Sequence, residues 1–124
     1  MSERLKASEC IQGFEFKLPR LNRQALINLA CKQHNRQQRK KAAKLDDIFT
    51  EPEYIGPQAH VNVLARITVN YLRSICERDH PIIAQWRGDF KCFELYARAK
   101  SRVLSEIKEH YAWLKDECER QDIL

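Results

Sequence analysis

The sequence predicts an all-α protein, a compact domain of three to four helices with an extended N-terminal arm. Its 124 residues include only three Gly and four Pro, so long stretches contain no residue that breaks a helix. Apolar residues recur at spacings of three and four, which is the period of a helix with one buried face. The chain is long enough to bury one core, and we expect residues 1–124 to form a single helical domain.

Residues 1–17 are expected to form the arm. Phe14, Phe16 and Leu18 alternate with Glu15 and Lys17, a period of two that is typical of an extended segment. No second segment of this kind follows in the chain, so a sheet is not expected. We therefore expect the arm to be extended and to be fixed to the helical body.

The first helix is expected to begin near Pro19 and to bury an apolar stripe that ends at Leu29. Positions 32–41 then read KQHNRQQRKK and contain no apolar residue. A helix that is polar on all faces has nothing to bury against a core. The second half of this helix is therefore expected to stay off the core, before the chain breaks at residues 50–57.

The second helix is expected from about Gln58 to Asp79, and His80-Pro81 should end it. Its apolar face repeats at spacings of three and four: Val61, Leu64, Ala65, Thr68, Tyr71, Leu72, Ile75 and Cys76. Its polar face carries Asn62, Arg66, Asn70, Arg73 and Glu77. A short apolar helix, PIIAQW, should follow and stop near Gly88.

The last helical region is expected from Asp89, a good N-cap, to Gln121, with a bend near His110. We expect Lys100, inside its apolar stripe, to pack its stem and extend its amine into water. Trp113 lies off the stripe and is either covered by the PIIAQW helix or the arm, or is exposed for contact. The residues expected to be buried together are Leu64, Tyr71, Leu72, Ile75, Phe93, Leu104, Ile107 and Leu114.

Positive charge is concentrated in one segment of the chain. Residues 17–44 hold nine Lys and Arg and no Asp or Glu, whereas the whole chain carries +5, which leaves −4 for the remainder. A basic segment on such a body indicates a polyanionic partner, most simply a nucleic acid, DNA or RNA. Four acidic residues flank the segment and are expected to offset part of its charge: Asp46, Asp47, Glu51 and Glu53.

Within this segment, residues 32–44 form the basic tract, which supplies most of the candidate phosphate ligands. The candidates in the tract and on the second helix are Lys32, Arg36, Arg39, Lys40, Lys41, Lys44, Arg66 and Arg73. Interleaved Asn and Gln side chains can hydrogen-bond phosphates or base edges. These residues predict a small nucleic-acid-binding or nucleoprotein accessory protein. Two other interpretations stay open: a helical adaptor or inhibitor that binds another, acidic, protein, and an ordinary solvated helix face.

The remaining motifs predict neither a catalytic nor a metal site. The five cysteines contain no CxxC pair. We expect them to be reduced in the cytoplasm and to act mostly as small apolar core residues, and we do not expect a disulfide framework. The pairs Cys31/His34 and Cys76/His80 give a Cys2His2 count, but 41 residues separate them, so no metal is expected. HExxH, P-loop, GxSxG and GxGxxG motifs are absent, so we expect neither an enzyme nor a cofactor.

No stretch of the sequence approaches the roughly 18 apolar residues that a membrane-spanning helix requires. The first ten residues, MSERLKASEC, also lack the apolar run of a signal peptide. We therefore expect a cytoplasmic protein without a membrane partner.

Overall fold

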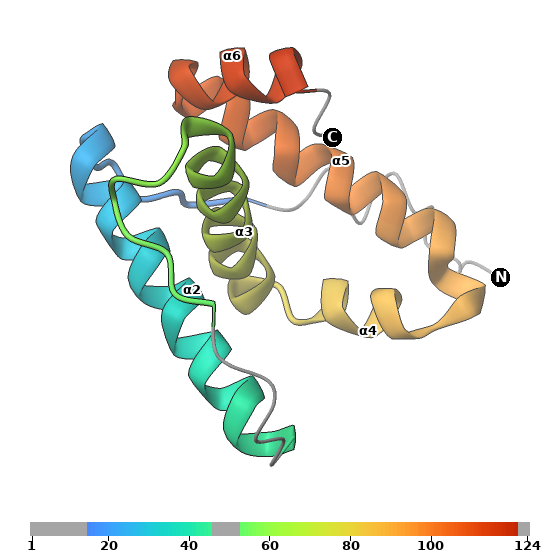
Figure 1. The fold of residues 1–124 in the computed structure, drawn as a ribbon. Coiled ribbons are helices and arrows are strands. Elements are labelled where there is room, and N and C mark those ends of the chain that lie inside the picture. Colours follow the sequence, from blue (N-terminus) through green and yellow to red (C-terminus); the bar gives the residue numbers. More distant parts are fainter. Residues whose placement is uncertain (1–14, 46–52, 122–124) are drawn as a thin grey trace, which may run out of the picture.

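The computed structural model describes residues 15–45 and 53–121 (Figure 1). The helices are α2 (Arg23–Leu45), α3 (Val61–Asp79), α4 (Ile82–Gly88), α5 (Phe93–His110) and α6 (Ala112–Gln121), with a short 3-10 helix η1 (Phe90–Cys92). The described residues contain no strand, so the all-α prediction is confirmed. The predicted count of three to four helices is wrong, because the region expected as one bent helix forms the two helices α5 and α6.

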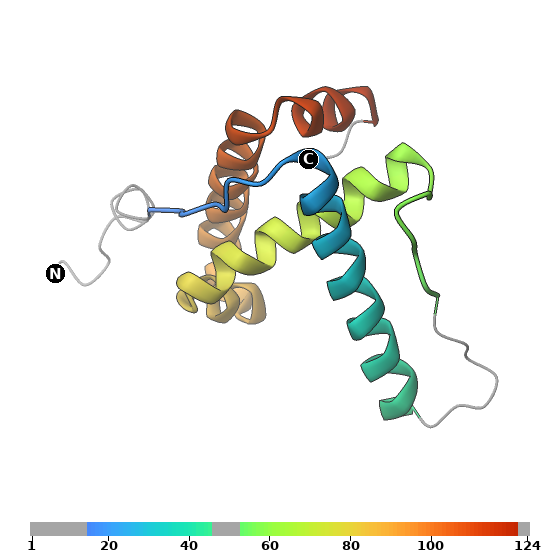
Figure 2. The ribbon, with the colours of Figure 1, turned by 90° about the vertical axis from the view of Figure 1, so that its left-hand side faces the viewer.

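Helix α3 is the centre of the fold and packs against each of the other four α-helices. Helix α2 crosses one side of α3, and α5 and α6 lie on the other side (Figures 1 and 2). Helix α4 turns back from the end of α3 and leads through η1 into α5. The position of every element therefore depends on α3.

The core consists of two apolar clusters. The larger cluster joins the arm and all five α-helices, and its fully buried side chains include Leu26, Leu72, Ile83, Ile107 and Leu114. The smaller cluster lies between α2 and α3 and contains Ile27, Ala30, Cys31, Leu64 and Ile67. Tyr71 and Trp113 are partly buried and pack against both clusters. The two clusters are thus joined at the crossing of α2 and α3.

The predicted apolar face of α3 is confirmed at its centre, where Leu64, Leu72 and Cys76 are buried. Thr68 is buried on the same face, and its hydroxyl donates to the Leu64 carbonyl at 2.6 Å. Val69 is buried as well, outside the predicted face. Helix α3 has neighbours on several sides and therefore buries more than one stripe of residues. The sequence prediction assumed a single buried face, so it did not include Val69.

The predicted stripe of the last helical region is wrong in its first turns. Phe93 was expected in the core but is 70% exposed, whereas Ala99 and Val103 are buried. Phe93 precedes Ala99 by six residues, which places it about 120° around the helix from the buried row. The buried row continues through Ile107, so from there on the prediction and the structure agree.

The predicted bend near His110 is confirmed at Tyr111, which separates α5 from α6 with an extended backbone (φ −128°, ψ 96°). The Tyr111 hydroxyl donates to the carbonyl of Pro19. Tyr111 therefore separates two helices through its backbone and attaches the N-terminal segment to the helical body through its side chain.

Residues 15–22 form an irregular segment that lies on the helical body. Its alternation is the predicted one, since Phe16 and Leu18 are buried while Glu15 and Lys17 are exposed. The Phe16 and His80 rings are T-shaped, with their centroids 5.2 Å apart, and Nε2 of His80 lies 2.9 Å from the Glu15 carbonyl oxygen. A carbonyl can only accept, so this His80 nitrogen is the donor. Residues 1–14, including Phe14, lie outside the described residues.

Helix α2 begins later than predicted, at Arg23 and not near Pro19. Asn22 caps it, because its Oδ1 accepts the Ala25 N–H at 2.8 Å. Pro19 restricts the backbone of the segment that leads to α2, but it is not part of the helix. The first turn of α2 also covers Trp113, whose ring lies 4.7 Å from the Arg23 guanidinium. Trp113 is thus half-buried, with part of its cover supplied by α2, which was not among the predicted covers.

The basic tract was expected to stay off the body, and this is wrong for its first turn. Asn35 is half-buried and forms two hydrogen bonds with the backbone of Ile55: its Nδ2 donates to the carbonyl at 3.0 Å, and its Oδ1 accepts the N–H at 2.8 Å. Gln33 donates to the Ser74 hydroxyl at 3.2 Å. Polar side chains thus hold this turn in place of apolar ones. Beyond it, α2 extends past the end of α3 (Figure 1).

The core assignment predicts a sharp contrast between two positions that the sequence pattern treats alike. Leu72→Ala should lower the free energy of unfolding by about 2–5 kcal/mol, because Leu72 is fully buried in the larger cluster. Phe93→Ala should cost less than about 1 kcal/mol, because most of this ring already faces solvent. Urea unfolding of the two variants checks this, and equal destabilisation would show that the first turns of α5 are misplaced.

The anchoring of the basic tract predicts a second contrast, between two neighbouring side chains. Asn35→Ala should cost about 1–3 kcal/mol, because the Ile55 backbone groups would then have no partner. Gln37→Ala, on the exposed side of the same helix, should change the free energy of unfolding by less than about 0.5 kcal/mol. Thermal unfolding monitored by circular dichroism measures both values. A neutral Asn35→Ala would mean that the tract has no anchor on the body.

Candidate functional site

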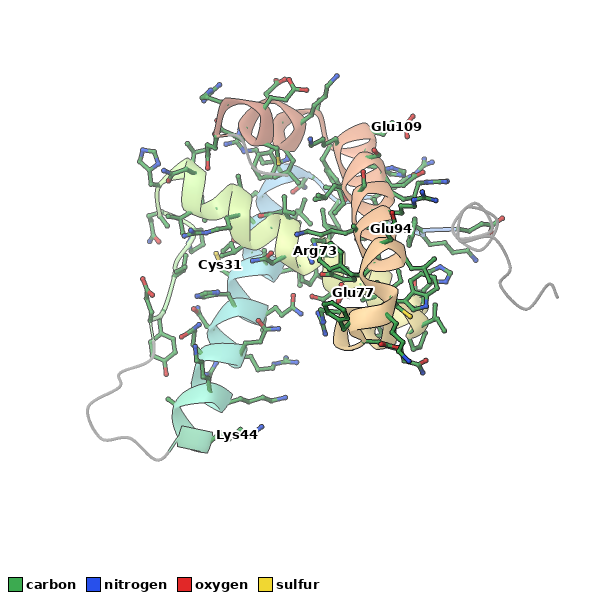
Figure 3. All side chains as sticks on the ribbon, turned by 90° about the vertical axis from the view of Figure 1, so that its right-hand side faces the viewer. Cys31, Lys44, Arg73, Glu77, Glu94 and Glu109 are labelled. Carbon is green, nitrogen blue, oxygen red and sulfur yellow. The ribbon has the colours of Figure 1, made fainter. Side chains whose placement is uncertain are left out.

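All six cationic side chains of the basic tract are exposed: Lys32, Arg36, Arg39, Lys40, Lys41 and Lys44. At about 100° per residue, the first four of them fall within an arc of about 100°. The centre of that arc lies more than 100° around the helix from Ala30 and Ile27, which pack on α3, while Lys32 and Arg36 within it border the groove beside α3. We call these four residues the basic face. Lys41 and Lys44 point elsewhere, but they lie on the part of α2 that extends beyond the body, with Lys44 at its far end (Figure 3).

The charge of the tract has no partner among the described residues. Every ion pair found in residues 15–45 and 53–121 involves other cations: Arg73, Arg87, Arg102 and Arg120. Of the four flanking acidic residues, Glu53 is exposed and the other three lie outside the described residues. Like charges at a spacing of four, such as Arg36 and Lys40, repel each other by a few tenths of a kcal/mol. This repulsion is of the same order as the stabilisation that cations near the C-terminus of a helix, such as Lys44, gain from the helix dipole.

The groove between α2 and α3 contains two hollows, which share Gln33, Tyr71 and Ser74 as lining residues. The first hollow, of about 340 Å³, is lined by Lys32 and Arg36 of α2 and by Arg78 of α3. We call it the cationic hollow. The second, of about 230 Å³, contains Arg73 and Glu77 of α3 and Arg87 of α4. The two hollows differ in charge because only the second contains a carboxylate.

Arg73, one of the predicted phosphate ligands, is engaged within the protein. Its side chain is 22% exposed, lies 3.9 Å from the Glu77 carboxylate and donates to the Tyr96 hydroxyl at 3.2 Å. Figure 3 shows Arg73 and Glu77 side by side on α3. Arg87 approaches the same carboxylate at 3.4 Å. Glu77 therefore has two cationic neighbours, and Arg73 is not presented to solvent in the way that the tract is.

Arg66, the other predicted ligand on α3, is exposed but is not brought to the basic face. It lines a separate hollow of about 600 Å³ together with Tyr54 and Asn70, where the contribution of α2 is His34. The cationic hollow instead receives Lys32 and Arg36 from α2. The structure thus groups Lys32 and Arg36 of the tract with Arg78, and it leaves Arg66 at a second exposed location.

Sequence reasoning missed Arg78. This residue lies in the last turn of α3, about 120° around the helix from Arg66, and so it is not on the predicted polar face. Its placement beside Lys32 follows from the crossing of α2 over α3, which no local pattern encodes. The only signal in the sequence was an Arg near the C-terminal end of a predicted helix. An Arg at this place usually complements the helix dipole, so it does not by itself indicate a binding site.

Of the four cysteines among the described residues, Cys31, Cys76 and Cys118 are buried and Cys92 is partly exposed. Burial raises the pKa of Cys31 and Cys118, and burial with nearby carboxylates raises the pKa of Cys76 to about 12. A thiol with a raised pKa is un-ionised at neutral pH and is a weak nucleophile and ligand. Cys31 and Cys76 belong to different apolar clusters. Within the described residues, no group of three or more His, Cys, Asp or Glu is placed to hold a metal ion.

None of the helices in the described part of the chain combines the length and the hydropathy that a bilayer span needs. Comparisons with protein-family models, with curated proteins and with solved structures find no match to this chain. The function is therefore inferred from the geometry and the charge of the chain itself.

Proposed function

We propose that this protein is a small nucleic-acid-binding or nucleoprotein accessory protein, and that the basic tract of α2 contacts the phosphate backbone. The observation that carries the proposal is the exposure of six cations on one helix, none of which has an ion-pair partner among the described residues. Cations that do not support the fold remain available to an external polyanion.

The dimensions of the tract suit a phosphate backbone. From Lys32 to Lys44 the helix rises about 18 Å at 1.5 Å per residue. The phosphates of one strand rise by about 3.4 Å each along the duplex axis, so the tract spans the axial length of about five of them. Six cations over this length are therefore enough to neutralise the phosphates that the helix can reach.

Not all of the polar side chains in the tract remain available for recognition. Gln33 and Asn35 are committed to Ser74 and to the Ile55 backbone. Gln37 is exposed and can hydrogen-bond a phosphate or a base edge. Because cations dominate the exposed surface of the basic tract, its affinity for nucleic acid should come mainly from sequence-independent phosphate contacts.

The direct test is a quadruple variant, Arg36→Gln, Arg39→Gln, Lys40→Gln and Lys41→Gln, assayed with fluorescent random-sequence duplex and single-stranded oligonucleotides. Binding should be abolished near physiological salt, and the dependence of log K on log salt should shrink by about one unit for each phosphate that the variant no longer neutralises. The variant should remain folded, because these exposed side chains have no partner among the described residues.

The matched control removes the same four charges elsewhere, as Lys17→Gln, Lys91→Gln, Arg98→Gln and Lys115→Gln, all at exposed positions. It should retain most of the affinity, because position and not net charge determines the binding. An equal reduction of affinity in the two variants would reject the basic tract as the site. Absence of oligonucleotide binding by the parent protein would reject the proposed function itself.

The second candidate function is a helical adaptor or inhibitor that occupies the surface of another protein. Two aromatic residues at the corner between α4 and α5 favour it, since Phe90 is 94% and Phe93 is 70% exposed. Aromatic side chains are enriched in protein interfaces, and an acidic partner could also reach the basic tract. Oligonucleotide binding near physiological salt separates the two candidates, because an adaptor does not require it.

A further inference from the structure

The cationic hollow combines three positive side chains from two helices. Lys32 and Arg36 project from successive turns of α2, and Arg78 projects from the last turn of α3. No acidic residue lines the hollow among the described residues. Three cations around one concave surface produce a stronger local potential than the same charges spread along a helix, because a cleft focuses their fields.

Glu77 and Asp79 are the nearest acidic residues in the sequence to Arg78, and neither lines the cationic hollow. Glu77 lines the neighbouring hollow, where Arg73 and Arg87 approach its carboxylate at 3.9 and 3.4 Å. Asp79 is exposed and about 100° around α3 from Arg78. Neither carboxylate is thus part of the lining of the cationic hollow.

Hydrogen bonds hold the floor of the groove in place before any ligand binds. Gln33 donates to the Ser74 hydroxyl at 3.2 Å, and this hydroxyl donates to the Asn70 carbonyl at 2.9 Å. Leu29 and Ile75 complete the lining with apolar surface. The backbone positions that carry Lys32, Arg36 and Arg78 are therefore fixed by the packing of α2 on α3.

The end of the α3 helix dipole opposes an anion in this place, so its magnitude has to be compared with that of the side chains. A helix C-terminus carries about half of a negative elementary charge. The His80 N–H, which donates to the Cys76 carbonyl at 3.1 Å, satisfies one of the groups that produce this charge. Three full positive charges exceed the remaining partial charge several-fold, so the net field favours an anion.

We infer that the cationic hollow between α2 and α3 binds a phosphate group, with Lys32, Arg36 and Arg78 as its ligands. Its volume of about 340 Å³ admits a phosphate together with an attached sugar. The inference deepens the proposed function, on which it rests where the phosphate belongs to a nucleic-acid strand. Arg78 then fixes the strand at the crossing of the helices, and the remaining cations of α2 follow the backbone outward.

The test compares Arg78→Gln with Arg98→Gln, a change at an exposed position of α5. Arg78→Gln should weaken oligonucleotide binding about five- to tenfold and lower the salt slope by about one unit, whereas Arg98→Gln should change neither. Arg78→Lys keeps the charge and should retain the slope. Circular dichroism should show that all three variants fold, since these arginines are exposed.

A second arm uses inorganic pyrophosphate as the probe and follows backbone amide shifts of Gln33, Ser74 and Arg78 by NMR. The shifts should saturate in the parent protein and in Arg98→Gln, but not in Arg78→Gln. If these shifts saturate as expected but no oligonucleotide binds, the hollow is a site for a free phosphate compound. The proposed function would then be rejected. Oligonucleotide binding that Arg78→Gln and Arg98→Gln affect equally would reject the hollow and leave the proposed function standing.

Discussion

The packing of α2 on α3 is the interaction on which the remainder of the structure depends. Helix α2 contributes Leu26, Ile27, Ala30 and Cys31 to the two clusters, and among its described side chains none beyond Cys31 is fully buried. The helix nevertheless continues to Leu45. Its first half is fixed by apolar burial, and its second half is held by a few polar contacts and by the helix propensity of Arg, Lys, Gln and Ala. The cations of the second half therefore add no burial to the core and form no ion pair among the described residues.

The same packing explains why charge is concentrated without disturbing the fold. Cations placed on a buried face would need partners or would give up their hydration at a cost of several kcal/mol. On an exposed helix that extends beyond the body, their mutual repulsion costs only a few tenths of a kcal/mol for each pair. Asn35 limits the freedom of this helix by binding the Ile55 backbone. The result is a row of cations on a helix whose direction is set by the packing of its first half on the core.

The sequence predicted those parts of the fold that follow from local periodicity. The apolar face of α3 and the alternation of Phe16 and Leu18 depend on spacing along the chain, and the bend near His110 was expected because one straight helix to Gln121 would be long for so small a domain. What it did not predict depends on contacts between distant segments. Phe93 is exposed because the buried row of α5 is set by α3 and α6, and Asn35 is half-buried because residue 55 returns to meet it. Arg78 joins the candidate site for the same reason, since its neighbour Lys32 lies 46 positions earlier.

Native-state hydrogen exchange along α2 tests the division of this helix most directly. Amides of residues 26–31 should exchange with a free energy near that of global unfolding, because they open only when the core does. Amides of residues 38–44 should exchange through local opening at clearly lower free energy, with those near Asn35 in between. Equal protection of both segments would contradict the account, because the basic tract would then be part of the cooperative core and its charges would have a structural role.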